Sequence, residues 1–193
     1  MKLRQSNKSY WDKRYKTGGT SGLGSVGNIR DWKWEIIHQY TNADSVLDVG
    51  CGDMSFWEGK KCADYLGLDI SPHIIRKLQK EHPWGIFICS NAKEKLDISK
   101  PVVLCLDLIF HITDEKTLEK IIFNLITWST DLIFIFNWDD KPNQLQSYHQ
   151  KYHNLLEKVD LFNKNDFNLI AQHSCPYTIG SMYVFKLIQS KNK

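Results

Sequence analysis

The sequence lacks the features of an exported or membrane-spanning protein. No stretch approaches the roughly 20 apolar residues of a membrane span, and the charged start MKLRQSNKSYWDKRY contains no apolar signal segment. The five cysteines are an odd, scattered set without a C-x-x-C pair, so neither a disulfide framework nor a zinc knuckle is indicated. We therefore expect a cytoplasmic protein with reduced cysteines.

The sequence also has little net charge, no internal repeat and no low-complexity tract. A formal net charge of +3 is too small to indicate a polyanionic partner by itself. Basic residues nevertheless outnumber the single acidic Asp12 in the first sixteen residues, at Lys2, Arg4, Lys8, Lys13, Arg14 and Lys16. An apolar content of 42% and seven tryptophans exclude a disordered chain. The length of 193 residues is typical of one domain.

Two helices separated by a glycine-rich loop are predicted at the start of this domain. Residues 5–16 form the first helix, with Tyr10, Trp11 and Tyr15 on one face. The next stretch, TGGTSGLGSVGN, contains five glycines and predicts a loop, after which an amphipathic helix follows. We interpret residues 1–28 as a helix and a flap beside the binding site, and 29–193 as the core. The alternative is an irregular extension without ligand contact.

Strands and helices alternate through the core. Strands are predicted at 45–49, 64–70, 85–90, 101–107 and 132–136, with helices at 71–82, after 113 and at 143–158. Two further strands, 167–173 and 182–188, are joined by a turn that makes them antiparallel neighbours. The pattern predicts an α/β fold: a doubly wound, mostly parallel sheet of seven strands with a C-terminal antiparallel hairpin.

The first strand ends in a glycine turn, Gly50-Cys51-Gly52, whose residues without Cβ allow the backbone to approach a ligand. In a doubly wound sheet, ligands bind beyond the carboxyl ends of the strands. Asp69 ends the second strand and could accept hydrogen bonds from both hydroxyls of a ribose, while Asn91 follows the third strand and could bond an adenine edge. Asp48 either attracts a ligand cation or holds the turn. Together these positions outline an adenosine site.

Four segments, VLDVGCGDM, YLGLDIS, ICSNAKE and VVLCLDLIFHI, resemble the class I, Rossmann-like S-adenosylmethionine-dependent methyltransferases over about residues 44–136. Two departures stand: Met54 replaces the third glycine of the turn, and Asn91 replaces an aspartate. The N-terminal WDKRYKTGGTSGLGSVG also resembles a segment of small prokaryotic methyltransferase-domain proteins often linked to surface polysaccharide genes. The resemblance implies S-adenosylmethionine as cofactor, bound by Asp48, Gly50, Cys51, Gly52, Asp69, Ile70, Asn91, Ala92 and Asp107.

Residues that follow the fourth and fifth strands are the candidates for acceptor chemistry. His111, four residues after Asp107, is a candidate general base because its unperturbed pKa lies near 6.5; packing against the backbone is the alternative. Asp107 is the second catalytic candidate, and the acceptor pocket is expected to contain Tyr10, Trp11, Tyr15 and Asn137. For the three aromatic residues, simple packing of the first helix is equally compatible with the pattern.

Two metal-like patterns are better explained without a metal, and we predict none. Asp107, Asn137 and Asp139 follow adjacent strands and could hold Mg²⁺, but polar residues at strand ends are common caps. His149 and His153 are one helical turn apart but have no acidic partner in the same motif, which favours a solvated helix face.

The resemblance therefore implies a methyltransferase, and we expect it to act on oxygen or nitrogen of a small-molecule or glycan-linked acceptor. The chain lacks the Asp/Asn-Pro-Pro-Tyr/Phe segment and the Pro-Cys pair of enzymes that methylate DNA bases. An RNA or protein methyltransferase guided by the basic N-terminus, and a binding module without catalysis, remain alternatives. An NAD-type oxidoreductase is disfavoured because Gly50-x-Gly52-x-x-Ser55 lacks the third glycine and no second catalytic domain follows.

Overall fold

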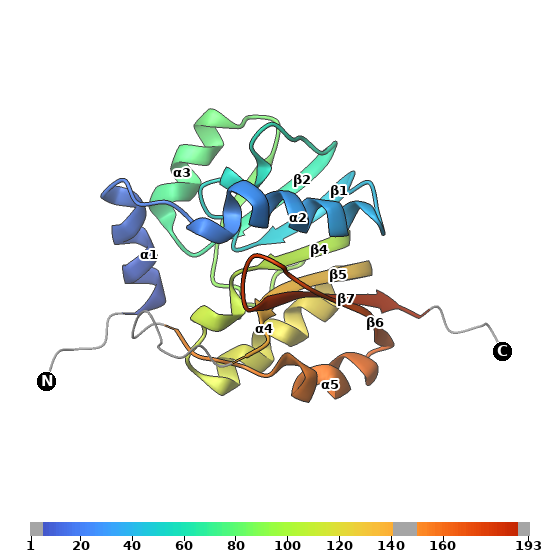
Figure 1. Ribbon diagram of the computed structural model, residues 1–193. Coiled ribbons are helices and arrows are strands. Elements are labelled where there is room, and N and C mark those ends of the chain that lie inside the picture. Colours follow the sequence, from blue (N-terminus) through green and yellow to red (C-terminus); the bar gives the residue numbers. More distant parts are fainter. Residues whose placement is uncertain (1–5, 141–149, 189–193) are drawn as a thin grey trace, which may run out of the picture.

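A computed structural model describes residues 6–140 and 150–188 of the chain, and its centre is one sheet. The strands are β1 (Ser45–Val49), β2 (Asp64–Asp69), β3 (Ile86–Cys89), β4 (Lys100–Leu106), β5 (Ser129–Trp138), β6 (Phe167–Ser174) and β7 (Gly180–Leu187). Their order is β3-β2-β1-β4-β5-β7-β6 (Figure 1). Strands β1 to β5 are parallel, and β7 is antiparallel to both β5 and β6. The predicted fold class is confirmed.

Helices connect the strands much as the periodicity predicts. They are α1 (Asn7–Lys16), α2 (Gly27–His38), α3 (Pro72–Glu81), α4 (Glu115–Trp128) and α5 (Val159–Asn163), with short 3-10 turns η1 (Leu23–Ser25), η2 (Ser55–Trp57), η3 (Ile109–His111) and η4 (Leu155–Lys158). Side chains cap three of the described α-helix starts: Ser6 accepts from the backbone of Ser9 in α1, Ser71 from that of Ile74 in α3, and Asp114 from that of Thr117 in α4.

The helix predicted at 143–158 is wrong within its described part, and residues 141–149 lie outside the described residues. Residues 150–154 are not helical, and only η4 follows before α5 begins. Hydrogen bonds to residues distant in sequence hold this stretch in a non-helical conformation. The Lys151 N–H donates to the Phe110 carbonyl at 2.8 Å, and the His153 ring contacts the Ile112 carbonyl at 2.6 Å. These partners are distant in sequence, so the local pattern gives no sign of them.

The helices divide between the two faces of the sheet. Helices α2 and α3 cover one face, where Trp34 and Ile75 pack against strand residues such as Val46. Helices α4 and α5 cover the other, where Ile121 packs in the same cluster as Leu47. Neighbours Val46 and Leu47 are both fully buried, one in each cluster. A parallel strand covered on both faces is largely apolar, and β1 is so apart from Ser45 and Asp48.

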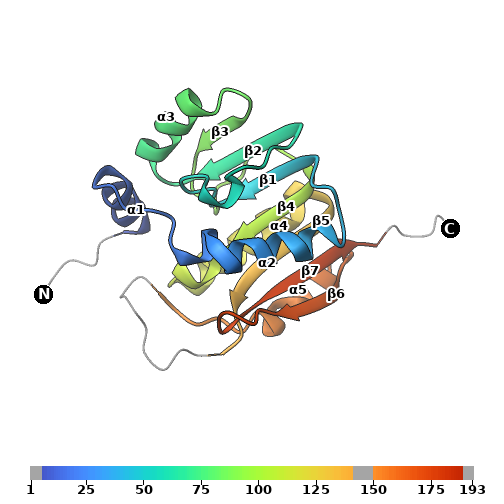
Figure 2. The ribbon, with the colours of Figure 1, turned by 45° about the horizontal axis from the view of Figure 1, so that its top comes forward.

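Helix α1 covers neither face of the sheet and lies beside the carboxyl ends of its parallel strands (Figure 2). It is tied to the start of α3, because the Asp12 carboxylate accepts hydrogen bonds from the Ser71 hydroxyl at 2.9 Å and the His73 N–H at 3.0 Å. Partial burial raises the pKa of Asp12, but hydrogen bonds from Lys16, His73 and Ser71 outweigh it and lower the pKa to about 2. The ionised Asp12 carboxylate thus anchors α1 at the N-terminus of α3, where a negative charge is favourable.

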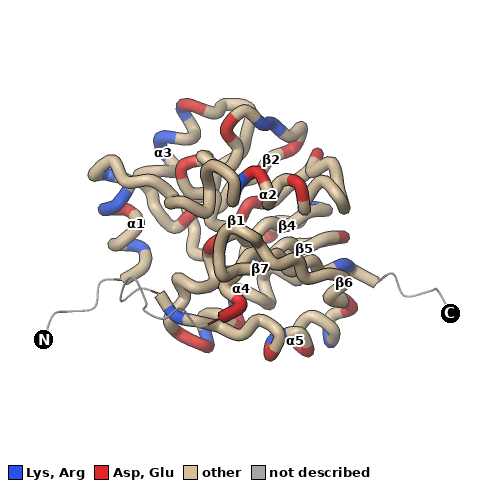
Figure 3. The backbone as a smooth tube through the Cα atoms, viewed as in Figure 1, with Lys and Arg blue, Asp and Glu red and all other residues tan. Residues whose placement is uncertain are grey.

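Charged residues of both signs are interspersed over the front of the molecule (Figure 3). Two cations of the basic N-terminal stretch have partners nearby in the sequence. Lys16 pairs with Asp12 at 2.6 Å, and Arg14 donates to the Thr20 carbonyl at 2.6 Å. Of the residues that the structure describes, none belongs to a helix with the length and apolarity needed to cross a bilayer.

The loop after β3 is held by a buried side chain of α4. The Asn124 amide donates to the carbonyls of Ala92 at 2.8 Å and Glu94 at 2.9 Å. We expect Asn124→Ala to lower the free energy of unfolding by about 1–3 kcal/mol, because two carbonyls lose their donor in a largely buried place. Urea denaturation measures this. The matched control is Asn165→Ala, an exposed residue whose side-chain amide donates to the Leu161 carbonyl, with an expected change within about 0.5 kcal/mol. Equal losses would contradict the anchoring role.

Candidate functional site

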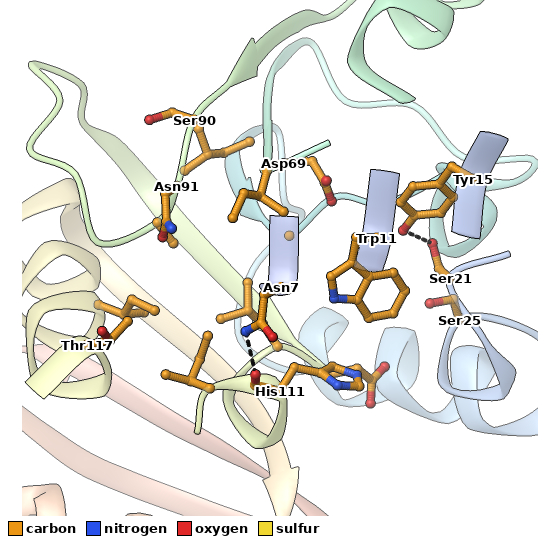
Figure 4. A pocket seen from close by; sticks show the side chains of 18 residues that line it. Asn7, Trp11, Tyr15, Ser21, Ser25, Asp69, Ser90, Asn91, His111 and Thr117 are labelled. Carbon is orange, nitrogen blue, oxygen red and sulfur yellow. Dashed lines mark hydrogen bonds between the residues drawn. The ribbon is translucent and has the colours of Figure 1, made fainter. Parts of the chain in front are cut away.

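A cavity lies at the carboxyl ends of β1 to β4, beside α1, with an empty volume of about 810 Å³ including its part open to solvent. Figure 4 shows Ser90, Asn91 and Thr117 towards one end, and Tyr15, Ser21 and Ser25 towards the other. Of the predicted cofactor residues, the structure brings six to the lining: Gly50, Asp69, Ile70, Asn91, Ala92 and Asp107.

The N-terminal segment forms the roof of the cavity. Trp11 and Tyr15 line it, with their rings stacked at a centroid distance of 5.8 Å, and the Trp11 ring meets that of His111 edge-on at 5.0 Å. The Asn7 amide donates to the His111 carbonyl at 2.6 Å (Figure 4). His111 itself lines the cavity. Tyr10 does not; its ring supports Trp11 from a centroid distance of 5.3 Å.

The glycine turn has the backbone that its sequence requires. Gly50 and Gly52 have φ of 85° and 57°, in the left-handed region that favours glycine. Gly50 lines the cavity, but Gly52 does not: the space above it is taken by the Ser21 hydroxyl, with the Tyr15 hydroxyl beside it. The close approach to Gly52 is therefore made by the protein's own flap. Met54, in the place of a third glycine, also has a left-handed φ of 65°.

Asp48 and Cys51 lie away from the cavity lining. The Asp48 carboxylate accepts from the Trp57 indole N–H at 2.8 Å and the Tyr65 hydroxyl at 3.0 Å, and Cys51 is buried. Burial raises the pKa of Asp48 to about 6, against the effect of both hydrogen bonds. Of the two roles that the sequence leaves open for Asp48, the geometry fits the one that holds the turn.

Asp69 is the acidic residue best placed for a polar ligand. Its two carboxylate oxygens accept from the backbone N–H groups of Gly52 at 3.2 Å and Ser71 at 2.8 Å, which fixes the side chain at the cavity wall. Burial raises its pKa to about 6 although these hydrogen bonds favour the anion. Each oxygen keeps acceptor capacity, so Asp69 can accept hydroxyl donors from a ligand.

Asp107, at the end of β4, forms an ion pair that the sequence interpretation missed. Its carboxylate receives the Lys33 ammonium of α2 at 2.5 Å, and the Lys33 side chain is fully buried. Asp107 has a left-handed φ of 57° and lines the cavity. A signal exists in the sequence: Lys33 has helical spacing with Ile29, Ile36 and Ile37, on the face that is expected to be buried.

The two metal-like patterns have other partners. Asn137 is fully buried outside the cavity lining and donates to the Trp138 and His153 carbonyls, while Asp139 receives the hydroxyls of Ser181 and Tyr183. In residues 6–140 and 150–188 no group of three or more His, Cys, Asp and Glu could hold a metal ion. His149 lies outside the described residues. The solvated helix face expected at His153 is wrong, because that side chain is buried against the Ile112 carbonyl.

No protein-family model and no curated protein matches the sequence. Solved structures match nearly its whole length. The N-methyltransferase NodS from Bradyrhizobium japonicum WM9 has a TM-score of 0.72 at 10% identity, covering 95% of this chain and 100% of that chain. Magnesium protoporphyrin IX methyltransferase from Synechocystis PCC 6803 has 0.68 at 14%, covering 94% and 98%. An S-adenosylmethionine-dependent methyltransferase from Clostridium acetobutylicum ATCC 824 has 0.63 at 13%, covering 93% and 97%. The chain has the class I methyltransferase fold.

The raised pKa of Asp48 predicts a pH-dependent stability. An unfolded aspartate ionises near pH 3.9, while folded Asp48 ionises near pH 6. As the pH rises, folded Asp48 therefore keeps its proton to a higher pH than unfolded Asp48 does. Its contribution to the free energy of unfolding is lost as the pH rises from about 4 to above 6. Relative to wild type, Asp48→Asn should gain about 2–3 kcal/mol of unfolding free energy between pH 4 and pH 7.

Urea denaturation at a series of pH values measures this difference. At pH 4 the wild-type side chain is still largely protonated in the fold, so the difference there isolates the effect of replacing a carboxyl by an amide. A difference that stays constant from pH 4 to pH 7 would mean that Asp48 is not held in a proton-retaining site.

Proposed function

We propose that the chain is an S-adenosylmethionine-dependent methyltransferase that transfers a methyl group to oxygen or nitrogen of a small-molecule or glycan-linked acceptor. The observation that carries this proposal is the cavity at the carboxyl ends of the parallel strands, with Asp69 after β2, Asn91 after β3 and Asp107 after β4 in its wall. The structures from Synechocystis and Bradyrhizobium, which share the fold, were solved with S-adenosylhomocysteine bound.

The side chains in the cavity wall suit the chemistry of this cofactor. Asp69 would accept hydrogen bonds from the ribose hydroxyls, and Asn91 would bond the adenine beside apolar side chains such as Ile112 and Ile121. The opposite end, with Gly50 and Asp107, would receive the amino-acid part. Both parts of the ligand thus find suitable partners within one cavity.

The chain's own residues would act mainly by positioning. When bound, S-adenosylmethionine supplies an electrophilic methyl group on a sulfonium sulfur and leaves as S-adenosylhomocysteine. The rings of Trp11 and Tyr15 are suited to face a cation, and the roof that they form limits water. His111 would accept the proton that the acceptor's O–H or N–H loses as its lone pair attacks the methyl carbon in line with the breaking C–S bond.

Two of the N-terminal cations, Arg14 and Lys16, favour a small acceptor over RNA by their contacts. Arg14 and Lys16 have partners within the N-terminal segment, and the Arg14 guanidinium also lies 5.7 Å from the centre of the Trp11 ring. Cations that fasten the roof are less available to phosphates in solution. The fold neighbours named above include an N-methyltransferase and a porphyrin methyltransferase, and we transfer to this chain only the general class of small acceptors.

Asp69→Ala should weaken binding of S-adenosylhomocysteine by about 1–3 kcal/mol, because hydroxyl donors lose a charged acceptor. Isothermal titration calorimetry measures the affinity. Asp64→Ala is the matched control: it removes an exposed carboxylate at the other end of β2 and should leave the affinity unchanged. Unchanged affinity in Asp69→Ala would remove Asp69 from the site, and binding of NAD in place of S-adenosylhomocysteine would overturn the proposed function.

His111→Ala should lower methyl transfer by at least roughly 100-fold while S-adenosylhomocysteine affinity changes by less than about 3-fold, because a general base acts on the acceptor. The assay follows a radiolabelled methyl group from S-adenosylmethionine into small-molecule fractions of a cell extract. His38→Ala, an exposed histidine stacked on Trp34 of the same helix, is the control. Normal transfer by His111→Ala would assign His111 to packing.

A further inference from the structure

Lys33 is a buried cation whose partners come from three separate parts of the chain. Its ammonium donates to the Asp107 carboxylate at 2.5 Å and to the Gly24 carbonyl at 2.9 Å, and lies 4.0 Å from the centre of the Phe136 ring. A lysine without solvent exposure is stable only when its charge is paired and hydrogen-bonded. Helix α2 thereby connects the end of β4, the end of β5 and the flap.

The flap also touches Asp107 directly. A Cβ added at Gly24 would overlap all three atoms of the Asp107 carboxyl group, so only glycine lets the flap backbone lie on this carboxylate. Gly24 has no left-handed φ, and its requirement is therefore one of space rather than of backbone conformation. Gly24, Lys33 and Asp107 form a contiguous polar cluster, which we call the flap clasp.

The flap is fastened at a second point on the glycine turn. The Ser21 N–H and hydroxyl both donate to the Asp53 carboxylate, at 3.0 and 2.7 Å, and the Asp53 N–H donates back to the Ser21 hydroxyl at 2.9 Å. The flap thus contacts the cavity wall beside β1 through Ser21 and beside β4 through the flap clasp. Both contacts include a residue that lines the cavity, Ser21 in the first and Asp107 in the flap clasp, and Asp107 does so from the end of β4.

We propose that Lys33 is a positioning residue that fixes the Asp107 carboxylate in the cavity wall and couples it to closure of the flap, residues 17–26, over the cofactor. This inference rests on the proposed function. With Lys33 in place, the end of the cavity that receives the amino-acid part of the cofactor is shaped only when the flap is closed. Binding there and closure of the flap therefore favour each other.

Two variants separate the parts of the flap clasp. Lys33→Met keeps the length of the side chain and removes its charge. Gly24→Ala keeps both charged residues and adds a methyl group where the carboxylate lies. Lys60→Met is the matched control, because Lys60 also lies against a ring, that of Trp34 at 5.0 Å, but is not part of the flap clasp. Hydrogen exchange of the amides of residues 20–26, with and without S-adenosylhomocysteine, and calorimetric affinity are measured for each protein.

In the wild type we expect S-adenosylhomocysteine to slow exchange of the flap amides. Lys33→Met and Gly24→Ala should each speed this exchange in the free protein about 10-fold or more and weaken S-adenosylhomocysteine binding about 10-fold or more, with exchange in β1 and β4 unchanged. Lys60→Met should match the wild type. The double variant Lys33→Met with Asp107→Asn should bind no more weakly than the weaker single variant, because the pair acts as a unit.

The outcomes distinguish the two proposals. If wild type does not bind S-adenosylhomocysteine, the proposed function fails, and the inference that depends on it fails with it. If wild type binds but Lys33→Met and Gly24→Ala keep wild-type affinity and flap exchange, the positioning role of Lys33 is overturned while the proposed function stands. If Lys33→Met fails to fold, Gly24→Ala decides: wild-type flap exchange in that variant overturns the coupling.

Discussion

Parallel strands that share one sheet end at one edge, and the rest of this molecule depends on that constraint. Residues far apart in sequence, such as Gly50, Asp69 and Asn91, meet because β1, β2 and β3 all run in the same direction. The apolar layers on both faces fix the register of these strands, so the positions of the polar side chains at their ends are set by the core. The place of the cavity therefore depends on strand direction more than on any single side-chain contact.

Most of the fold could be predicted because its signals are local. Apolar runs bounded by turn residues predict every strand, and the helices expected at 71–82 and after 113 are found as α3 and α4, capped by Ser71 and Asp114. The helix expected at 143–158 was wrong in its described part for a non-local reason. The backbone of Lys151 and the ring of His153 bond to carbonyls about 40 residues away, and these contacts prevail over helical propensity.

The parts of the candidate site whose position depends on strand direction could be predicted from the sequence. The parts whose orientation depends on side-chain partners were harder to predict. Placement of Asp69 and Asn91 at the wall follows from strand ends. The orientation of Asp48 depends on Trp57 and Tyr65, which bind its carboxylate beneath the turn. Lys33 was missed because a single lysine among the apolar residues of a helix face does not indicate burial unless its partner, Asp107, is known.

The roof of the cavity differs from the core in how it is held. Tyr15 is the one buried side chain that α1 contributes, η1 contributes none, and Leu23 at the tip of the flap is 81% exposed. Polar contacts of Ser21, Lys33 and Asp12 hold the roof instead. Segments with few buried apolar contacts open at a lower free energy than the core. A ligand can therefore enter beneath this roof without disturbing the sheet, and its binding energy can contribute to closing it.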